Sequence, residues 1–151
     1  MKKVKILGFL GVFSLLAIIP VLLILKLAPN EVQYKTVKIS DAKVRAEIAD
    51  TQLKRIEGLM SRKTLPANEG MLFIFDDENH HGIWMMNMGF PIDIVWIDRN
   101  LEIVDIAEDA QPCTFNCPIY QPDEKALYVL EVNSGFVGKN KLRIGDSVSI
   151  S

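Results

Sequence analysis

Two histidines and two cysteines are the nitrogen and sulfur metal ligands that this chain of 151 residues offers. Cys113 and Cys117 lie four positions apart in a loop bracketed by prolines, and His80 is followed directly by His81. Zinc takes a tetrahedral set of such ligands, so these four side chains are the minimum for one site. Adjacent strand residues point to opposite faces, so both histidines reach one ion only where the chain turns. We therefore assign no metal site, and a solvated histidine turn is the preferred interpretation.

Copper is a separate alternative, because three methionines follow His81: Met85, Met86 and Met88. Thioether sulfur selects Cu(I). In a strand, however, the period of two would divide these methionines between both faces, and methionine also fills irregular gaps in a core. Handling of copper or zinc thus stays an alternative function.

Asp93 is the carboxylate most suited to chemistry, because it lies between Ile92 and Ile94 in an apolar run and a buried carboxylate needs a partner. An enzyme of unknown reaction using Asp93 with Asn87 and Arg62 is a second alternative. Trp84 offers an aromatic floor for a small ligand beside these polar groups. The chain has no Gly-x-Ser-x-Gly motif, and we assign no catalytic residue and no cofactor.

The first part of the chain has the composition of a membrane anchor. Residues 6–25 carry no charge, and a helix of that length reaches about the 30 Å of a bilayer's hydrocarbon core. Signal peptides have a shorter apolar run, of roughly 7 to 15 residues, before a small-residue cleavage motif. Lysines precede the span, which keeps the amino terminus in the cytoplasm. A cleaved signal peptide and a buried soluble helix are the alternatives.

We therefore expect a single-pass protein of the cell membrane in four parts. Residues 1–5 are cytoplasmic, residues 6–27 form a transmembrane signal anchor, residues 28–33 form a linker, and residues 34–151 form an extracytoplasmic domain. Outside the cytoplasm a disulfide between Cys113 and Cys117 is the leading interpretation, with free thiols or a reactive cysteine as alternatives.

The charge of the domain argues against nucleic acid as a partner. The whole chain has 17 Lys and Arg against 19 Asp and Glu, and four of the lysines but none of the acids precede residue 29. The remainder carries 13 basic and 19 acidic residues, a net charge of -6. A nucleic-acid binder needs a basic excess gathered in a patch.

Short segments with β patterns, separated by turn residues, fill the domain. Residues 44–49 alternate apolar and charged side chains, which is typical of a strand with one wet face. Asp50 or Thr51 is a suitable N-cap for a helix to about Met60, with Leu53 and Ile56 on one face. Other strands are expected at 34–39, 71–75, 83–88, 91–97, 101–106, 126–132 and 144–150, with a long loop at 107–124 and a short turn or helix at 135–140. The pattern predicts a mainly β fold, a small β-sandwich or barrel-like domain with one or two short helices.

Several motifs, in this order, resemble those of the domain-of-unknown-function-192 family. They are Gly58-Leu-Met-Ser-Arg62, Glu69-Gly-Met-Leu-Phe-Ile-Phe75, Trp84-Met-Met-Asn87, Pro91-Ile-Asp-Ile94, Pro112-Cys-Thr114, Cys117-Pro118, Val129-Leu-Glu-Val132 and Ile144-Gly-Asp146. The family's usual form has Lys in place of Met86 and Thr in place of Met88. The resemblance implies a small, mainly β domain found in prokaryotic proteins that are often exported or anchored, and it implies no established reaction.

The resemblance also adds Glu131 to the candidate residues. The ligand-binding candidates are then Arg62, Trp84, Asn87, Asp93 and Glu131. The leading hypothesis is a membrane-anchored extracytoplasmic module that binds a small molecule or an envelope protein without catalysis.

Overall fold

The structure is a computed structural model that describes residues 31–151. The predicted cytoplasmic segment, the predicted membrane span and most of the predicted linker lie outside the described residues. Within residues 31–151, the helices are too short to reach across a bilayer.

The domain consists of short strands with two short helices. In chain order they are β1 (Tyr34–Ile39), β2 (Ala42–Ala49), α2 (Gln52–Glu57), β3 (Glu69–Asn79), β4 (Ile83–Trp84), β5 (Ile92–Ile97), β6 (Ile103–Ala110), β7 (Ile119–Tyr120), β8 (Ala126–Asn133), α3 (Phe136–Asn140) and β9 (Val148–Ile150). The predicted mainly β class and the predicted short helices are therefore confirmed.

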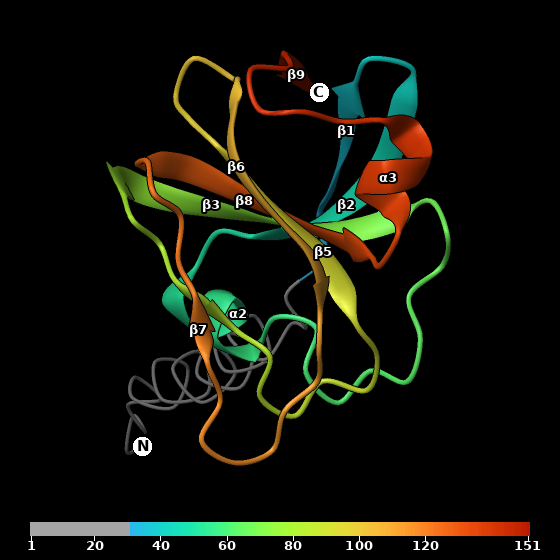
Figure 1. Cartoon of the computed structure of the whole chain (residues 1–151), viewed down its shortest axis with the longest axis vertical. Helices are drawn as coiled ribbons and strands as arrows, with labels where there is room; N and C mark the ends of the chain where they lie inside the picture. The colour runs from blue at the N-terminus through green and yellow to red at the C-terminus, as the bar shows by residue number, and fades with distance from the viewer. Residues whose placement is uncertain (1–30) are drawn as a thin grey trace, which may run out of the picture. The chain divides into compact units, whose positions relative to one another are not determined.

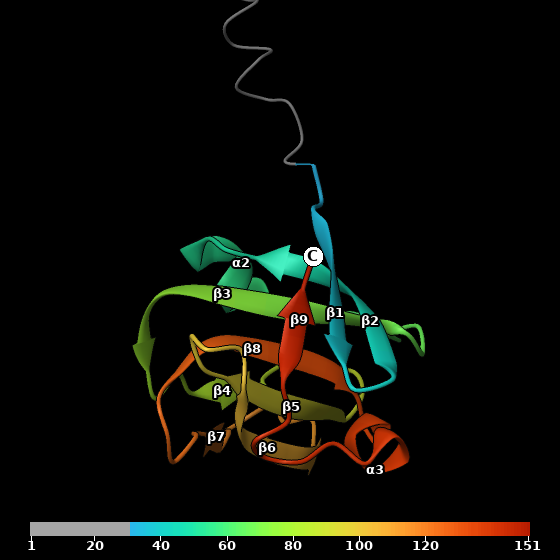
Figure 2. The same cartoon turned by 90° about the horizontal axis from the view of Figure 1, so that it is seen from above.

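Seven of these strands form one curled sheet with the order β6-β5-β8-β3-β2-β1-β9 (Figure 1). All its pairs are antiparallel except β2 with β3, which are parallel and joined through α2. The two edge strands also meet where each begins, because the amide of Ile103 in β6 donates to the carbonyl of Asp146 and the amide of Val148 in β9 donates to that of Leu101. The sheet is thus a half-barrel and not a two-sheet sandwich, as its curvature in Figure 2 shows.

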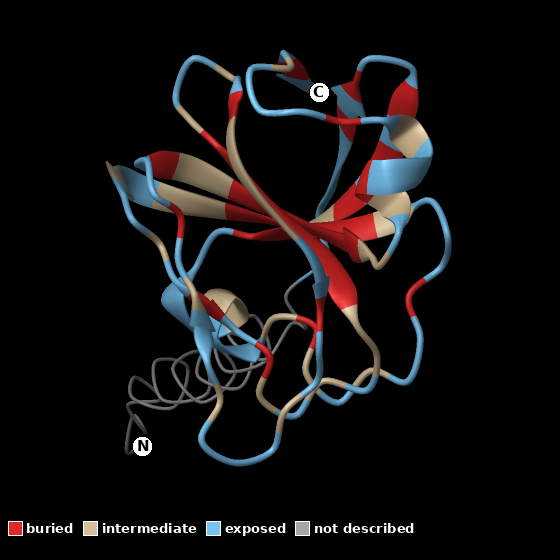
Figure 3. Cartoon of the chain, viewed as in Figure 1, coloured by how far each residue is buried: buried red, intermediate tan, exposed pale blue. Residues whose placement is uncertain are grey.

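Each face of the sheet carries a hydrophobic cluster, and Figure 3 shows how buried residues concentrate along the central strands. The first cluster fills the inside of the curl, with contributions from both edge strands and from α3. The second lies on the opposite face, where the segments between β3 and β5 and between β6 and β8 cover it. All six residues of β5 are buried, since this strand has neighbours on both sides and is covered on both faces.

Several predicted elements have other bounds than the observed ones: the strand expected at 71–75 covers Glu69–Asn79, and the one expected at 144–150 is limited to Val148–Ile150. Three further differences have identifiable reasons. The strand expected at 83–88 is limited to Ile83–Trp84, because Asn87 has a positive φ of 55° and turns the chain. The helix expected to reach Met60 ends at Glu57, since Gly58 adopts a φ of 49° and terminates it. The long loop at 107–124 is partly regular, because β6 extends to Ala110 and β7 pairs with β4.

Candidate functional site

The helix α2 forms one side of a groove on the second face of the sheet. Of the two predicted N-caps, Asp50 and Thr51, the structure has Thr51, whose hydroxyl oxygen accepts a hydrogen bond of 3.3 Å from the amide of Lys54. No residue of α2 is buried. Leu53 is 74% exposed and Ile56 is 51% exposed, so the apolar positions of this helix are not covered by the described part of the chain.

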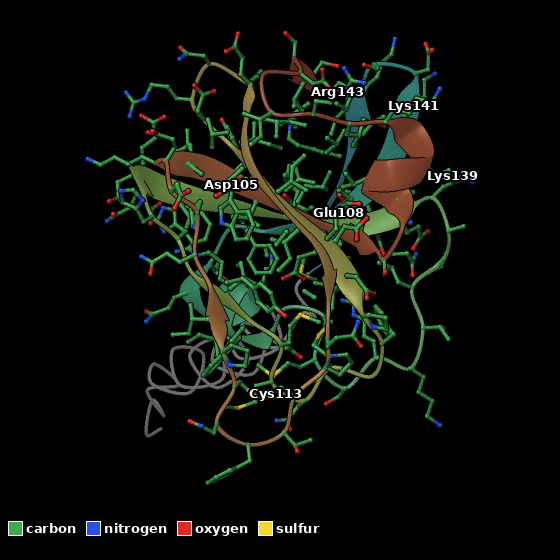
Figure 4. The ribbon with its side chains drawn as sticks, in the orientation of Figure 1. Asp105, Glu108, Cys113, Lys139, Lys141 and Arg143 are labelled. Carbon is green, nitrogen blue, oxygen red and sulfur yellow. A yellow bond between two sulfur atoms is a disulfide. The ribbon has the colours of Figure 1, made fainter. Side chains whose placement is uncertain are left out.

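The other side of the groove is the small ribbon of β4 and β7. Ile83 pairs with Tyr120 and Trp84 pairs with Ile119. Beyond β4, Met86 forms a bridge to Cys113, which connects the ribbon to the loop closed by the disulfide. The predicted disulfide between Cys113 and Cys117 is present, with a Cα–Cα distance of 5.6 Å. Figure 4 shows Cys113 at the lower end of the domain, far from Lys139, Lys141 and Arg143 near α3.

The groove between these two walls has a volume of about 280 Å³ and a largely apolar lining. Its floor comes from Phe73 and Phe75 of β3, whose rings stack at a centroid distance of 6.5 Å. Arg55 is the charged residue in the lining, and it is already engaged, because its guanidinium donates to the carbonyl of Ile74 at 2.7 Å. The groove can therefore accept an apolar group the size of a small organic molecule.

Glu131 lies at the inner end of this region, in a cavity of about 60 Å³ that shares Phe73, Ile83 and Trp84 with the groove. The residue is 4% exposed, and its Oε2 atom has no hydrogen-bond partner among residues 31–151. A buried polar atom without a partner is costly, by about 1–3 kcal/mol. Burial raises the pKa of the Glu131 carboxyl to about 8, against the opposing charge of Arg62. The group is thus mostly protonated at neutral pH and can donate a hydrogen bond.

Arg62 is directed to a different carboxylate, Glu47, with which it forms an ion pair at 2.8 Å. Glu47 is aligned with Met71 on the neighbouring strand, and Met71 is aligned with Glu131 on the next. These side chains therefore share one face of the sheet. Glu47 is ion-paired, whereas Glu131 has only the longer-range influence of the same guanidinium.

Asp93 lies on the opposite face of the sheet from Glu131. It is aligned with Val132, which belongs to the first cluster, whereas its neighbour Ile94 is aligned with Glu131. Asp93 is fully buried, and its two carboxylate oxygens accept bonds from the amides of Asp109 (2.9 Å) and Val137 (2.8 Å). A buried carboxylate was expected to need partners, and Asp93 finds them in two backbone amides. These hydrogen bonds connect β5 to β6 and to α3. The set of Asp93 with Asn87 and Arg62 is not brought together on one face.

Asn87 has a backbone role in the structure. Its amide donates to the carbonyl of Cys113 at 2.9 Å, and its carbonyl accepts from the amide of Ser61 at 3.1 Å. The positive φ at Asn87 is one that asparagine tolerates better than most residues. Trp84, by contrast, is 44% exposed and lines both the groove and the inner cavity. Of the predicted ligand-binding residues, Trp84 and Glu131 line one cavity, and Arg62 is close enough to act electrostatically on Glu131.

The residue types that suggested a metal are used for other contacts. His80 Nδ1 lies 3.0 Å from the carbonyl oxygen of Pro122, and His81 Nε2 lies 2.9 Å from that of Asp77. The His81 ring also stacks on Phe75, with centroids 3.5 Å apart. Within residues 31–151, no three His, Cys, Asp or Glu side chains are grouped as a metal would require.

A second hollow, wider and more polar, lies beside α3 and has a volume of about 540 Å³. Lys43, Asn133 and Lys139 are among its lining residues. The amide of Asn133 is already bonded to the carbonyls of Leu65 and Pro66. This hollow contains none of the predicted site residues and none of the unpartnered buried atoms found in the described chain.

Sequence reasoning missed most of the groove lining. Phe73 and Phe75 alternate along one strand, which was the available signal that both face the same side. Ile119 lies in the long loop, and nothing in its neighbourhood indicated the pairing with Trp84. The alternating pattern of residues 44–49 predicts a solvent-facing side chain at Glu47 and does not indicate its ion pair with Arg62.

Comparison with protein families agrees with these motifs. The model of DUF192, described as an uncharacterised family, matches residues 35–150. The chain belongs to the DUF192 family. Relatives of this DUF192 domain include a UPF0127 protein of Thermococcus gammatolerans, 32% identical over 105 residues, which are 68% of this chain. The match spans 64% of that relative's length. The UPF0127 protein PH1112 of Pyrococcus horikoshii is 31% identical over 67% of this chain and 83% of its own.

Two solved structures resemble the DUF192 domain described above. One is from Sinorhizobium meliloti and is described as a candidate transcription regulator; its TM-score is 0.75 at 27% identity, covering 82% of this chain and 98% of that one. The other is a protein of unknown function from Novosphingobium aromaticivorans, with a TM-score of 0.71 at 28% identity, covering 81% of this chain and 89% of that one. The half-barrel is therefore shared with these two proteins.

Proposed function

We propose that this DUF192 protein is a membrane-anchored, extracytoplasmic module that binds a small amphipathic molecule in the groove between α2 and the β4–β7 ribbon. The anchor is residues 6–27, with the amino terminus in the cytoplasm. The apolar, uncharged run and the preceding lysines support this topology. The disulfide between Cys113 and Cys117 agrees with an oxidising compartment.

The observation that carries the binding proposal is the unpartnered Oε2 of Glu131 beside an apolar groove. Ligand sites are mostly apolar with a few polar groups that fix orientation. Phe73, Phe75 and Trp84 supply the apolar surface, and Glu131 supplies the polar group. A ligand that fills the groove and reaches the inner cavity removes apolar area from water and gives Glu131 its missing hydrogen bond.

The state of Glu131 defines the polar end of the ligand. Because its pKa is about 8, the carboxyl is mostly neutral at pH 7 and donates to an acceptor such as a carbonyl oxygen. The positive charge of Arg62 nearby also disfavours a cationic ligand. The ligand class is therefore an apolar chain or ring that ends in an uncharged hydrogen-bond acceptor.

Two probes with the same chain and different polar ends test this proposal. Octanamide offers a carbonyl acceptor, whereas octylamine is cationic at pH 7. With the full-length protein in lipid nanodiscs, octanamide is expected to raise the thermal unfolding temperature more than octylamine, because ligands that bind only the folded state stabilise it. In Glu131→Leu the stabilisation by octanamide falls and the difference between the two probes shrinks to the part that Arg62 contributes. The proposed site is refuted if wild type and Glu131→Leu show the same difference between the two probes, or if neither probe shifts the unfolding temperature of the wild type.

A matched control is Ile144→Ala, which removes an exposed apolar side chain that does not line the groove. This variant keeps the preference for octanamide. The topology is tested separately by the accessibility of the domain to protease added outside intact cells, and protection of the domain there contradicts the extracytoplasmic assignment.

A further inference from the structure

Exposed apolar side chains surround the mouth of the groove. They come from three separate elements: Leu53 and Ile56 from α2, Trp84 from β4 and Ile119 from β7. Their exposed fractions are 74%, 51%, 44% and 65% in the same order. We call these four residues the apolar rim. Three of them, Ile56, Trp84 and Ile119, also line the groove itself.

The fold of the described domain does not account for the apolar rim. The helix α2 buries none of its residues, so Leu53 and Ile56 contribute nothing to either core cluster. An apolar helix face that is left uncovered beside a groove is typical of a surface that meets another apolar phase. Singly exposed apolar residues, such as Ile144 elsewhere on the domain, need no such explanation.

The chain joins the domain beside the apolar rim. The carbonyl of Gln33 accepts a hydrogen bond of 2.9 Å from the amide of Ile48, and α2 begins only four residues later, at Gln52. At about 3.3 Å per residue, that separation is at most roughly 13 Å. Val32 and Tyr34, at the same junction, are 51% and 40% exposed.

The length of the linker then limits how far this junction lies from the bilayer. Residues 28–33, even when fully extended, reach at most roughly 20 Å. A domain anchored by residues 6–27 therefore keeps the junction, and the nearby start of α2, close to the membrane surface. The net charge of -6 carried after residue 28 disfavours attraction to anionic headgroups, so the contact must be apolar.

We propose that the apolar rim inserts into the interface of the lipid bilayer, so that the groove opens toward the acyl chains. This inference rests on the proposed anchoring, and it identifies the source of the ligand as the membrane itself. An amphipathic molecule then passes between bilayer and groove with its apolar part continuously out of water. Amphipathic elements that lie in the interface place their apolar face roughly 5–10 Å into it.

Tryptophan fluorescence tests the insertion, because the domain has one exposed and one buried tryptophan. Trp84 is 44% exposed, whereas Trp96 is 1% exposed and donates to the carbonyl of His81. The full-length protein is placed in phosphatidylcholine vesicles whose acyl chains carry bromine, a short-range quencher. We expect quenching in the wild type and its loss in Trp84→Phe, which leaves Trp96 alone.

Two further variants in the Trp84→Phe background provide a matched pair. Ile119→Trp puts the fluorophore on the apolar rim, and Ile144→Trp puts it beside Arg143, which lies at the opposite end of the domain from Cys113 in Figure 4. The proposal expects quenching of the first and none of the second. Equal quenching of the two, or none of either, overturns it.

The outcomes also separate the insertion from the anchoring on which it rests. Extraction of the vesicles with alkaline carbonate shows whether the chain is an integral membrane protein. A chain that is released refutes the anchor. A chain that stays in the membrane with unquenched Trp84 refutes the insertion alone. Emission of Trp84 that instead shifts to the blue as the protein-to-lipid ratio rises shows that a second copy covers the rim, which also overturns the proposal.

Discussion

The protonation of Glu131 makes the stability of the domain depend on pH in a direction that can be measured. The ordinary pKa of a glutamate, about 4.5, applies to the unfolded chain, and burial raises the pKa of Glu131 to about 8 in the folded domain. Well below pH 4.5 the group is protonated in both states, and it adds no pH dependence to the free energy of unfolding. As the pH rises toward 8, the unfolded state loses its proton first, so the free energy of unfolding falls.

The expected size follows from about 1.4 kcal/mol for each pH unit between the two pKa values. Over the full interval the loss approaches roughly 5 kcal/mol, and between pH 5 and pH 8 it is roughly 3 to 4 kcal/mol. Glu131→Gln is the matched variant, because it has the shape of the neutral acid and does not titrate. The variant is therefore similar to wild type near pH 5 and more stable by roughly 3 kcal/mol near pH 8.

Urea unfolding of the full-length protein in nanodiscs, followed by tryptophan emission, measures this difference across the pH range. Trp96 is a suitable reporter because it lies in the second cluster, on the same face as Glu131. Comparison with Glu131→Gln at each pH cancels the titration of all other groups. If the two free-energy curves run parallel from pH 5 to pH 8, the assignment of Glu131 as a buried acid without a partner is wrong.

Three other variants have expected effects on stability, each measured by urea unfolding at pH 6. Asp93→Asn keeps one acceptor oxygen and sets an NH2 group against the other backbone N–H, so it loses one of the two bonds and the charge in the second, and is expected to cost about 2–3 kcal/mol; wild-type stability would show that those bonds are not formed. Gly70→Ala places a Cβ 2.5 Å from the carbonyl oxygen of Glu131 and is expected to cost about 1–3 kcal/mol, whereas a stabilising effect contradicts the close approach of β3 and β8. Replacing both Cys113 and Cys117 by Ser is expected to lower the free energy of unfolding by about 2 kcal/mol relative to the oxidised wild type. An unchanged free energy of unfolding refutes a stabilising role for the disulfide.

The elements were predictable from the sequence where the pattern is local. β1 occupies the predicted residues 34–39, and Thr51 caps α2 because a hydroxyl before an apolar period needs no distant partner. The disulfide was also predictable, since its cysteines are only four residues apart. The sheet order was not, because the pairing of β8 with both β3 and β5 depends on contacts between distant parts of the chain.

For Asp93 and Glu131 the sequence indicates burial but not the hydrogen-bond partners. Each carboxylate lies between two apolar strand residues, and each is buried. The sequence signal is the same for both, yet Asp93 finds two backbone amides and Oε2 of Glu131 finds no partner among residues 31–151. The amides come from Asp109 and Val137, which are 16 and 44 residues away. Such partners are set by tertiary packing. The local sequence pattern therefore predicts that a carboxylate is buried, but not whether it finds hydrogen-bond partners.

The pairing of β1 with β9 has a consequence for when the domain can fold. Val37 is aligned with Ile150, and Thr36 and Ser151 exchange backbone hydrogen bonds. The outer edge of β1 is therefore paired only when β9, more than one hundred residues later in the chain, is in place. Topologies dominated by such non-local contacts fold slowly, in milliseconds to seconds. We expect a nascent chain to emerge with β1 and β2 as an open edge, vulnerable to association with other chains until the last strand arrives.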